Sequence, residues 1–151
     1  MQKKLTKEDI GKLIPHRYPF LFLDELINIE KLKTATGINI FTENEYFFKG
    51  HFPGHPIVPG VILIEMMAQT AAALIAYSIR EETKDKIVYL MNVEKTKFRK
   101  PVFPNQKIYA NVTALRSKGR VWRFEGKIYN EKDENICEAV WSAMIMDKNN
   151  V

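Results

Sequence analysis

The sequence has very little cysteine, since Cys137 is the only one among 151 residues. A single thiol cannot form a disulfide within the chain, and it cannot build a cysteine-type zinc site by itself. Residues 1–9 contain no apolar run suited to a secretory signal. These features favour a reducing compartment, and we expect a cytoplasmic protein.

Long apolar runs are also scarce, with one exception at residues 61–79. This run approaches the length that spans a bilayer. It contains Glu65 and Gln69 one helical turn apart, and a carboxylate at mid-bilayer costs about 3 kcal/mol or more. We therefore expect a buried helix of a soluble protein and no membrane span.

A strong charge of either sign is absent, because the formal net charge is only +5. The basic residues are spread along the chain and form no polybasic block. This balance favours an acidic partner over a basic one. A nucleic-acid-binding protein remains an alternative on charge alone, but no recognition motif supports it, so we expect no nucleic acid partner.

The composition fits one compact domain over residues 1–151, with 46% hydrophobic and 27% charged residues. Thr6 and Asp9 resemble a capping box at the start of a short helix, and apolar periodicity predicts a second, enclosed helix. Alternation and turn signals predict strands, several of them joined as hairpins. The expected helices are Lys7–Leu13 and Val61–Glu82, and the expected strands are Phe20–Ile29, Lys33–Thr42, Lys86–Lys95, Gln106–Arg116, Val121–Tyr129 and Ile136–Met146. Together they predict an α+β fold in which a curled antiparallel sheet wraps around one long central helix.

The segment from His51 to Gln69 carries the residues best suited to chemistry. His51 lies in a loop with three prolines in seven residues, which holds the backbone in one extended path. Imidazole accepts a proton near neutral pH, and burial of Glu65 would raise its pKa and let it hold a proton. The N–H of Gly60, at the start of the helix, suits a carbonyl that gathers negative charge. A base, an acid and an oxyanion donor are the groups needed to eliminate water next to a thioester.

Each of these residues also has a less specific interpretation. A loop histidine is more often structural than catalytic, Gly60 can serve close packing alone, and Gln69 can satisfy a buried Glu65. His51, His55 and Glu65 are candidate metal ligands, but the prolines break any helix that would place both histidines on one face. We therefore expect no metal site.

Three ordered blocks resemble one family. Residues 50–61 with 65–69 are similar to the signature of the FabZ-type (3R)-hydroxyacyl-[acyl-carrier-protein] dehydratases, and residues 13–24 and 97–104 resemble two further blocks of that family. The resemblance covers most of the chain and implies a hot-dog fold. It also implies a hydro-lyase of fatty acid biosynthesis, which converts 3-hydroxyacyl-[acyl-carrier-protein] to the trans-2-enoyl product.

The resemblance implies roles at matched positions. His51 would take the C2 proton, and Glu65 of a partner chain would protonate the departing hydroxyl. Gly60 N–H would polarise the thioester carbonyl, while the Ile57 carbonyl would fix the tautomer of His51. Tyr89 matches a position that gates the acyl tunnel in some relatives, although an aromatic packed in a strand is the alternative. Glutamate at position 65, where the isomerising dehydratases have aspartate, favours the plain dehydratase branch.

The implied partners are acyl carrier protein and further copies of the chain, as a homodimer that assembles into a hexamer (trimer of dimers). No cofactor is implied. Lys97 and Arg99, with Lys100 adjacent, are expected on one face as a docking site for the acidic carrier; a solvated charged edge is the alternative. His16 and Arg17 lie in the first block without an assignable chemical step.

The sequence departs from the family pattern at Asn105 and Gln106, where Gly-Asp is usual, and we expect that turn to differ in shape. Two other functions remain open for a hot-dog protein. An acyl thioesterase would use water as nucleophile and would not need His51. A non-catalytic acyl-thioester-binding module would not need to retain both His51 and Glu65.

Overall fold

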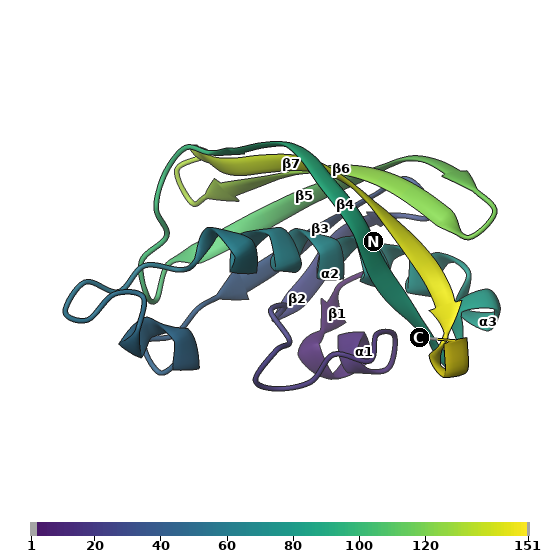
Figure 1. Cartoon of the computed structure of the whole chain (residues 1–151), viewed down its shortest axis with the longest axis horizontal. Coiled ribbons are helices and arrows are strands. Elements are labelled where there is room, and N and C mark those ends of the chain that lie inside the picture. The colour runs from purple at the N-terminus through teal and green to yellow at the C-terminus, as the bar shows by residue number, and fades with distance from the viewer. Residues whose placement is uncertain (1–2, 151) are drawn as a thin grey trace.

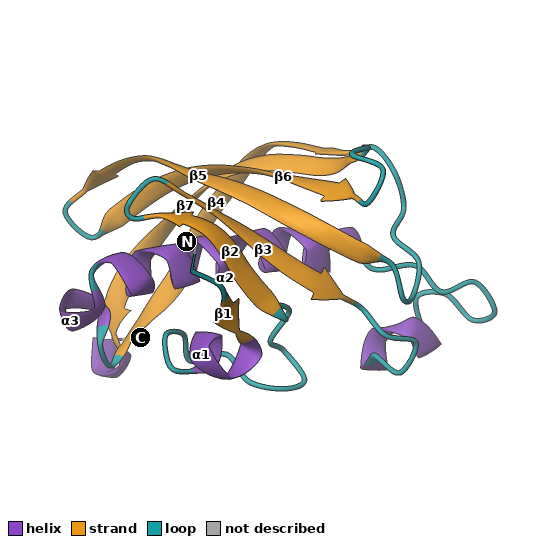
Figure 2. Cartoon of the chain, turned by 180° about the vertical axis from the view of Figure 1, so that it is seen from behind, coloured by secondary structure: helices purple, strands orange, loops and turns teal. Residues whose placement is uncertain are grey.

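The computed structural model describes residues 3–150, which form a seven-stranded antiparallel sheet curled around the helix α2 (Figures 1 and 2). The strand order is β1-β2-β3-β5-β6-β7-β4. The strands are β1 (Leu5–Thr6), β2 (Glu25–Glu30), β3 (Thr34–Ile40), β4 (Lys86–Phe98), β5 (Lys107–Lys118), β6 (Val121–Asn130) and β7 (Asn135–Asp147). The helical elements are α1 (Lys7–Gly11), α2 (Gly60–Ser78), α3 (Arg80–Thr83) and the 3-10 turns η1 (Tyr46–Lys49) and η2 (Lys148–Asn150). The predicted α+β fold with a wrapped helix is confirmed.

The apolar character of α2 is explained by its position inside the sheet. The helix is long and apolar enough to cross a bilayer, but 67% of its most apolar window is buried in the fold. Its residues Met66, Met67, Ala73 and Leu74 are completely enclosed. A helix that is apolar on most sides is expected where protein surrounds it, as in the core of a soluble domain.

Local capping chemistry sets the start of α1. The Thr6 side chain accepts the Asp9 N–H, and the Asp9 carboxylate accepts the Thr6 N–H at 3.0 Å. This is the predicted capping box. The helix ends at Gly11, two residues before the expected end at Leu13.

The strand expected from Phe20 begins only at Glu25, so its first five residues were predicted wrongly. The reason is a side chain from α2. Gln69 accepts the Phe22 N–H at 2.8 Å and donates to the Phe20 carbonyl at 2.9 Å. These backbone groups therefore bind an amide side chain in place of a neighbouring strand, which the alternation of apolar residues does not reveal.

The expected long helix is interrupted near its C-terminus. Ile79 leaves the helical region, with φ −133° and ψ 56°, so the four residues of α3 form a separate element. Ile79 packs against the core, and this partial burial accompanies the change of direction.

Strand β4 lies at one edge of the sheet and pairs only with β7 in the described chain. It is three residues longer than expected and includes Lys97. Register shifts occur after Leu90 and after Glu94, and Lys95 has a φ of +51°. The regular alternation of a strand is therefore broken by a bulge at Lys95, which turns side chains away from period-two positions.

The remaining strands follow the predicted hairpins. β5 and β6 are joined through Gly119, whose φ of +61° suits a tight turn that a β-carbon would strain. β6 and β7 pair from Val121 to Tyr129. The hairpins place β7 between β6 and the distant β4, which closes the sheet over α2.

Candidate active site

The loop before α2 holds His51 by backbone contacts. The Ile57 N–H donates to the His51 carbonyl at 3.0 Å, and the Val58 N–H donates to the Val102 carbonyl at 2.9 Å. The His51 ring Nδ1 lies 2.9 Å from the Ile57 carbonyl oxygen. Since a carbonyl accepts only, Nδ1 carries the hydrogen and Nε2 is left with a free lone pair. This is the form of imidazole that can take a proton from carbon.

Gly60 is the first residue of α2, and the ring of Phe98 lies over it. A β-carbon built on Gly60 would stand 2.8 Å from the nearest ring atom of Phe98, so glycine is required for this close approach. The Gly60 N–H has no acceptor within the described chain. Free N–H groups in the first helical turn point outward with the positive end of the helix dipole and favour an oxygen that gains negative charge.

These residues line one cavity of about 500 Å³, called here the histidine cavity. Its walls come from the proline-rich loop, the start of α2 and the end of β4. Its lining residues are His51, Ile57, Val58, Gly60, Val61, Leu63, Phe98, Arg99, Lys100, Pro101 and Val102.

Glu65 lies one and a half turns into α2, and its side chain is 22% exposed. Gln69 donates an N–H to Glu65 Oε2 at 2.9 Å, as their spacing of one turn suggested. Burial raises the pKa of the Glu65 carboxyl above its ordinary value, and the hydrogen bond from Gln69 acts in the opposite direction. The predicted upward shift is confirmed, and it favours a carboxyl that holds a proton.

Glu65 lines a second cavity of about 300 Å³, called here the glutamate cavity. Half-exposed Tyr89 on β4 stands at its wall. The full lining is His16, Glu65, Ala68, Ala72, Val88, Tyr89, Leu90, Phe124 and Ala143. The walls are mostly apolar, which suits a hydrocarbon chain.

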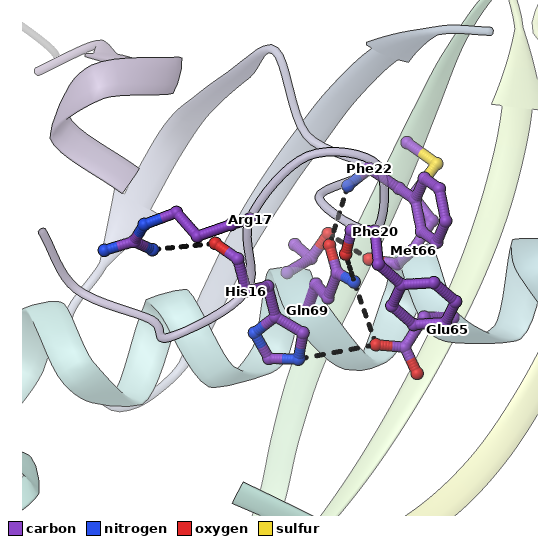
Figure 3. A network of polar contacts seen from close by, with 8 residues as sticks. His16, Arg17, Phe20, Phe22, Glu65, Met66 and Gln69 are labelled. Carbon is purple, nitrogen blue, oxygen red and sulfur yellow. Dashed lines mark hydrogen bonds and ion pairs between the residues drawn. The ribbon is translucent and has the colours of Figure 1, made fainter. Parts of the chain in front are cut away.

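One residue of the glutamate cavity was missed as a site residue. His16 Nε2 lies 3.5 Å from Glu65 Oε2 (Figure 3). Burial, with a smaller contribution from the charge of Arg17, lowers the pKa of the His16 imidazole. Because the pKa of Glu65 shifts upward, both groups favour their neutral forms. The position of His16 in the first matched block was the available signal, but 49 residues separate it from Glu65.

The described chain therefore does not bring the proposed base and acid into one cavity. His51, Ile57 and Gly60 share the histidine cavity, whereas Glu65 and Tyr89 share the glutamate cavity. Along the helix axis, Gly60 and Glu65 are about 7.5 Å apart on different faces.

The basic residues of the third block lie beside the histidine cavity. Arg99 forms an ion pair with Glu138, and Lys100 pairs with Glu134 at 2.6 Å. Lys97 stands outside both cavities and has no ion pair in the part of the chain that the structure describes. Among residues 3–150, no three His, Cys, Asp or Glu side chains gather as they would around a metal ion.

The turn at Asn105 and Gln106 shows how the sequence departure is accommodated. Asn105 has a φ of +70°, a conformation that asparagine tolerates and glycine adopts readily. The Gln106 side-chain oxygen accepts the Phe103 N–H at 2.9 Å, so a side-chain acceptor closes the turn.

Comparisons with known proteins identify the family of this chain. A FabA-like domain model matches residues 14–140. The chain is 46% identical to the 3-hydroxyacyl-[acyl-carrier-protein] dehydratase FabZ of Gluconobacter oxydans, over 91% of this chain and 80% of the relative. It is 44% identical to the enzyme of the same name from Rhodospirillum rubrum, over 95% and 91%.

Solved structures share the fold at low identity. A dehydratase heterocomplex, ApeI:P of Xenorhabdus doucetiae, has a TM-score of 0.79 at 18% identity, covering 93% of this chain and 92% of the other. A Thermus thermophilus thioesterase superfamily member has a TM-score of 0.61 at 16% identity, covering 81% and 87%. These two likenesses concern the fold alone. The match over residues 14–140 and the identity to curated dehydratases show that this chain belongs to the FabA-like family.

Proposed function

We propose that this protein is a 3-hydroxyacyl-[acyl-carrier-protein] dehydratase of fatty acid biosynthesis, which releases water and forms the trans-2-enoyl thioester. The observation that carries the proposal is the high identity to curated enzymes of that name over nearly the whole chain. The geometry of the site adds physical support, because a candidate base, an oxyanion donor and a carboxyl of raised pKa all line cavities of this fold.

In the proposed reaction, His51 acts as the base. Its Nε2 takes the proton from C2 of the substrate while the Ile57 carbonyl holds the hydrogen on Nδ1. The thioester carbonyl, polarised by the Gly60 N–H, stabilises the negative charge that develops at C2.

Glu65 then supplies the proton that leaves with the C3 hydroxyl as water. Loss of the C3–O bond and formation of the C2–C3 double bond complete the elimination. The proton held by His51 returns through solvent, and Glu65 is protonated again before the next turnover. The raised pKa of Glu65 supports its part as the acid.

This scheme requires two copies of the chain, because His51 and Glu65 line different cavities in one. The edge strand β4 supports such pairing. It is 13 residues long, one of its edges is unpaired in the described chain, and it exposes Tyr89, Leu90, Met91, Val93 and Phe98. A long apolar edge in a soluble protein is a template for another strand. We propose that the two β4 strands meet and that His51 of one copy faces Glu65 of the other.

The hexamer, as a trimer of such dimers, and the cytoplasmic location are proposed on the sequence resemblance and on the single buried cysteine. The carrier-docking role of Lys97, Arg99 and Lys100 is supported by the position of Arg99 and Lys100 on the rim of the histidine cavity. Tyr89, at the wall of the glutamate cavity, is proposed to gate the acyl chain.

The proposal is tested by incubating the purified protein with a 3-hydroxyacyl carrier thioester and following the enoyl product by mass spectrometry. We expect conversion to the equilibrium mixture without added cofactor. Release of free acid with no enoyl product would instead indicate a thioesterase, and binding without any conversion would indicate a non-catalytic acyl-binding module.

A further inference from the structure

Glu65 belongs to a polar network that reaches the first sequence block (Figure 3). Gln69 is oriented in it without ambiguity. The Phe22 N–H can only donate and the Phe20 carbonyl can only accept, so the Gln69 oxygen faces Phe22 and its nitrogen faces Phe20. The second hydrogen of that nitrogen is directed at Glu65 Oε2, 2.9 Å away.

His16 approaches the same carboxyl oxygen from the loop before β2. Its Nε2 stands 3.5 Å from Glu65 Oε2, and its Nδ1 is buried with no hydrogen-bond partner in the described residues. A hydrogen on Nδ1 would be a buried donor without an acceptor, which is rare in native proteins. The neutral imidazole therefore carries its hydrogen on Nε2, facing Glu65.

The loop itself is held so that His16 keeps this position. The Arg17 guanidinium donates from Nη1 to the Ile14 carbonyl at 2.8 Å and to the His16 carbonyl at 2.7 Å. Arg17 Nη1 therefore bonds to backbone oxygens, and the polar contacts of the Glu65 carboxyl come from His16 and Gln69.

Gln69 donates an N–H to Oε2 and His16 Nε2 lies 3.5 Å from the same oxygen, whereas Oε1 has no hydrogen bond within residues 3–150 and points away from the network (Figure 3). A hydroxyl hydrogen on Oε2 would meet those N–H hydrogens, so the proton of the carboxyl belongs on Oε1. We propose that His16 is a positioning residue which, together with Gln69, fixes Glu65 so that Oε1 presents the proton to the leaving hydroxyl. This inference rests on the proposed function of Glu65 as the acid.

The test compares His16→Phe, which keeps a ring but removes the donor, with His16→Gln, whose amide nitrogen reaches about as far as Nε2 and keeps an N–H. We expect kcat to fall about 10- to 50-fold for His16→Phe with KM changed less than about 3-fold, since the residue acts on the acid and not on substrate binding. His16→Gln should retain kcat within about 5-fold of wild type.

A pH profile separates positioning from a structural role. Removing an N–H donor from the Glu65 carboxylate favours the protonated form, so the basic limb of kcat/KM should move to higher pH in His16→Phe. In the described chain, the other titratable side chain lining this cavity is Tyr89. The double variant His16→Phe/Glu65→Gln should be no slower than Glu65→Gln alone, because His16 acts through Glu65.

Three results would overturn the inference while leaving the dehydratase proposal intact: wild-type kcat in His16→Phe, an unmoved basic limb, or additive losses in the double variant. The inference would also be overturned, in favour of a structural role, if His16→Phe and His16→Gln lost activity to the same extent and both lost thermal stability. Full activity in Glu65→Gln would instead refute the acid role itself.

Discussion

The two cavities are built in opposite ways. In the histidine cavity the base is positioned locally: the proline-rich loop runs directly into α2 and His51 is held by a carbonyl six positions away, while residues 98–102 only complete the wall. The glutamate cavity depends on partners far along the chain, since Glu65 meets His16 from 49 residues upstream and Tyr89 from β4. Local sequence therefore sets the base, whereas the packing of loop, helix and edge strand sets the acid.

The largest expected effect comes from removing either group. His51→Ala and Glu65→Ala should each lower kcat by at least ~100-fold with the fold intact, the scale for losing a general base or acid. Mixing the two inactive variants under conditions of subunit exchange should restore part of the activity, because a mixed dimer has one site with both residues. If labelled chains exchange and no activity returns, the proposal that His51 and Glu65 of two different chains form one site is wrong.

A smaller effect is expected at Gly60, where the start of α2 contacts the Phe98 ring at the end of β4. Gly60→Ala keeps the N–H but places a β-carbon against the Phe98 ring, so we expect kcat to fall roughly 10-fold, less than for loss of an oxyanion donor. The double variant Gly60→Ala/Phe98→Leu relieves the contact and should recover much of the rate. An unchanged kcat in Gly60→Ala would mean that the position of this N–H is not critical.

Charge reversal at Lys97 and Arg99 tests whether the carrier protein docks beside the histidine cavity. Reversing Lys97 and Arg99 to Glu should raise the apparent KM for carrier-bound substrate about 10-fold, mainly through slower association, and raised salt should reproduce part of the loss. A substrate on a small pantetheine thiol should be converted almost as before.

The ion pair of Arg99 with Glu138 requires its own control. Arg99→Glu/Glu138→Arg restores a pair of opposite charges in reversed order. A high KM in this swap supports a direct role of Arg99 in docking, whereas full recovery would assign the effect to the strand pairing of β4 with β7.

The smallest effect concerns stability. The folded pKa of Glu65 is raised, so its protonated form favours folding at low pH and that contribution is lost as pH rises through the folded pKa. The Tm of Glu65→Gln relative to wild type should therefore increase between pH 5 and pH 8. Glu138→Gln is the control: the bond from Arg99 lowers the pKa of Glu138, so its contribution is lost only at pH below the ordinary glutamate range, and the Tm difference of this variant should stay constant between pH 5 and pH 8. A Tm difference for Glu65→Gln that does not change with pH would contradict the burial effect.

The sequence alone determined those features that depend on neighbours along the chain. The capping box of Thr6 and Asp9, the hairpin turn at Gly119 and the enclosed helix are each specified by short-range chemistry or periodicity. The same holds for the upward pKa shift of Glu65, because a carboxyl on an apolar helix loses hydration wherever that helix is buried.

Tertiary structure decided what depends on residues distant in sequence. Residues 20–24 are not a strand, and there Gln69 binds the Phe22 N–H and the Phe20 carbonyl, two backbone groups that a strand would have paired. The contact of His16 with Glu65, the bulge at Lys95 and the separation of the two cavities likewise arise only when loop, helix and sheet pack together. Periodicity reports which face of an element is buried, and it carries no information on which distant side chain reaches that face.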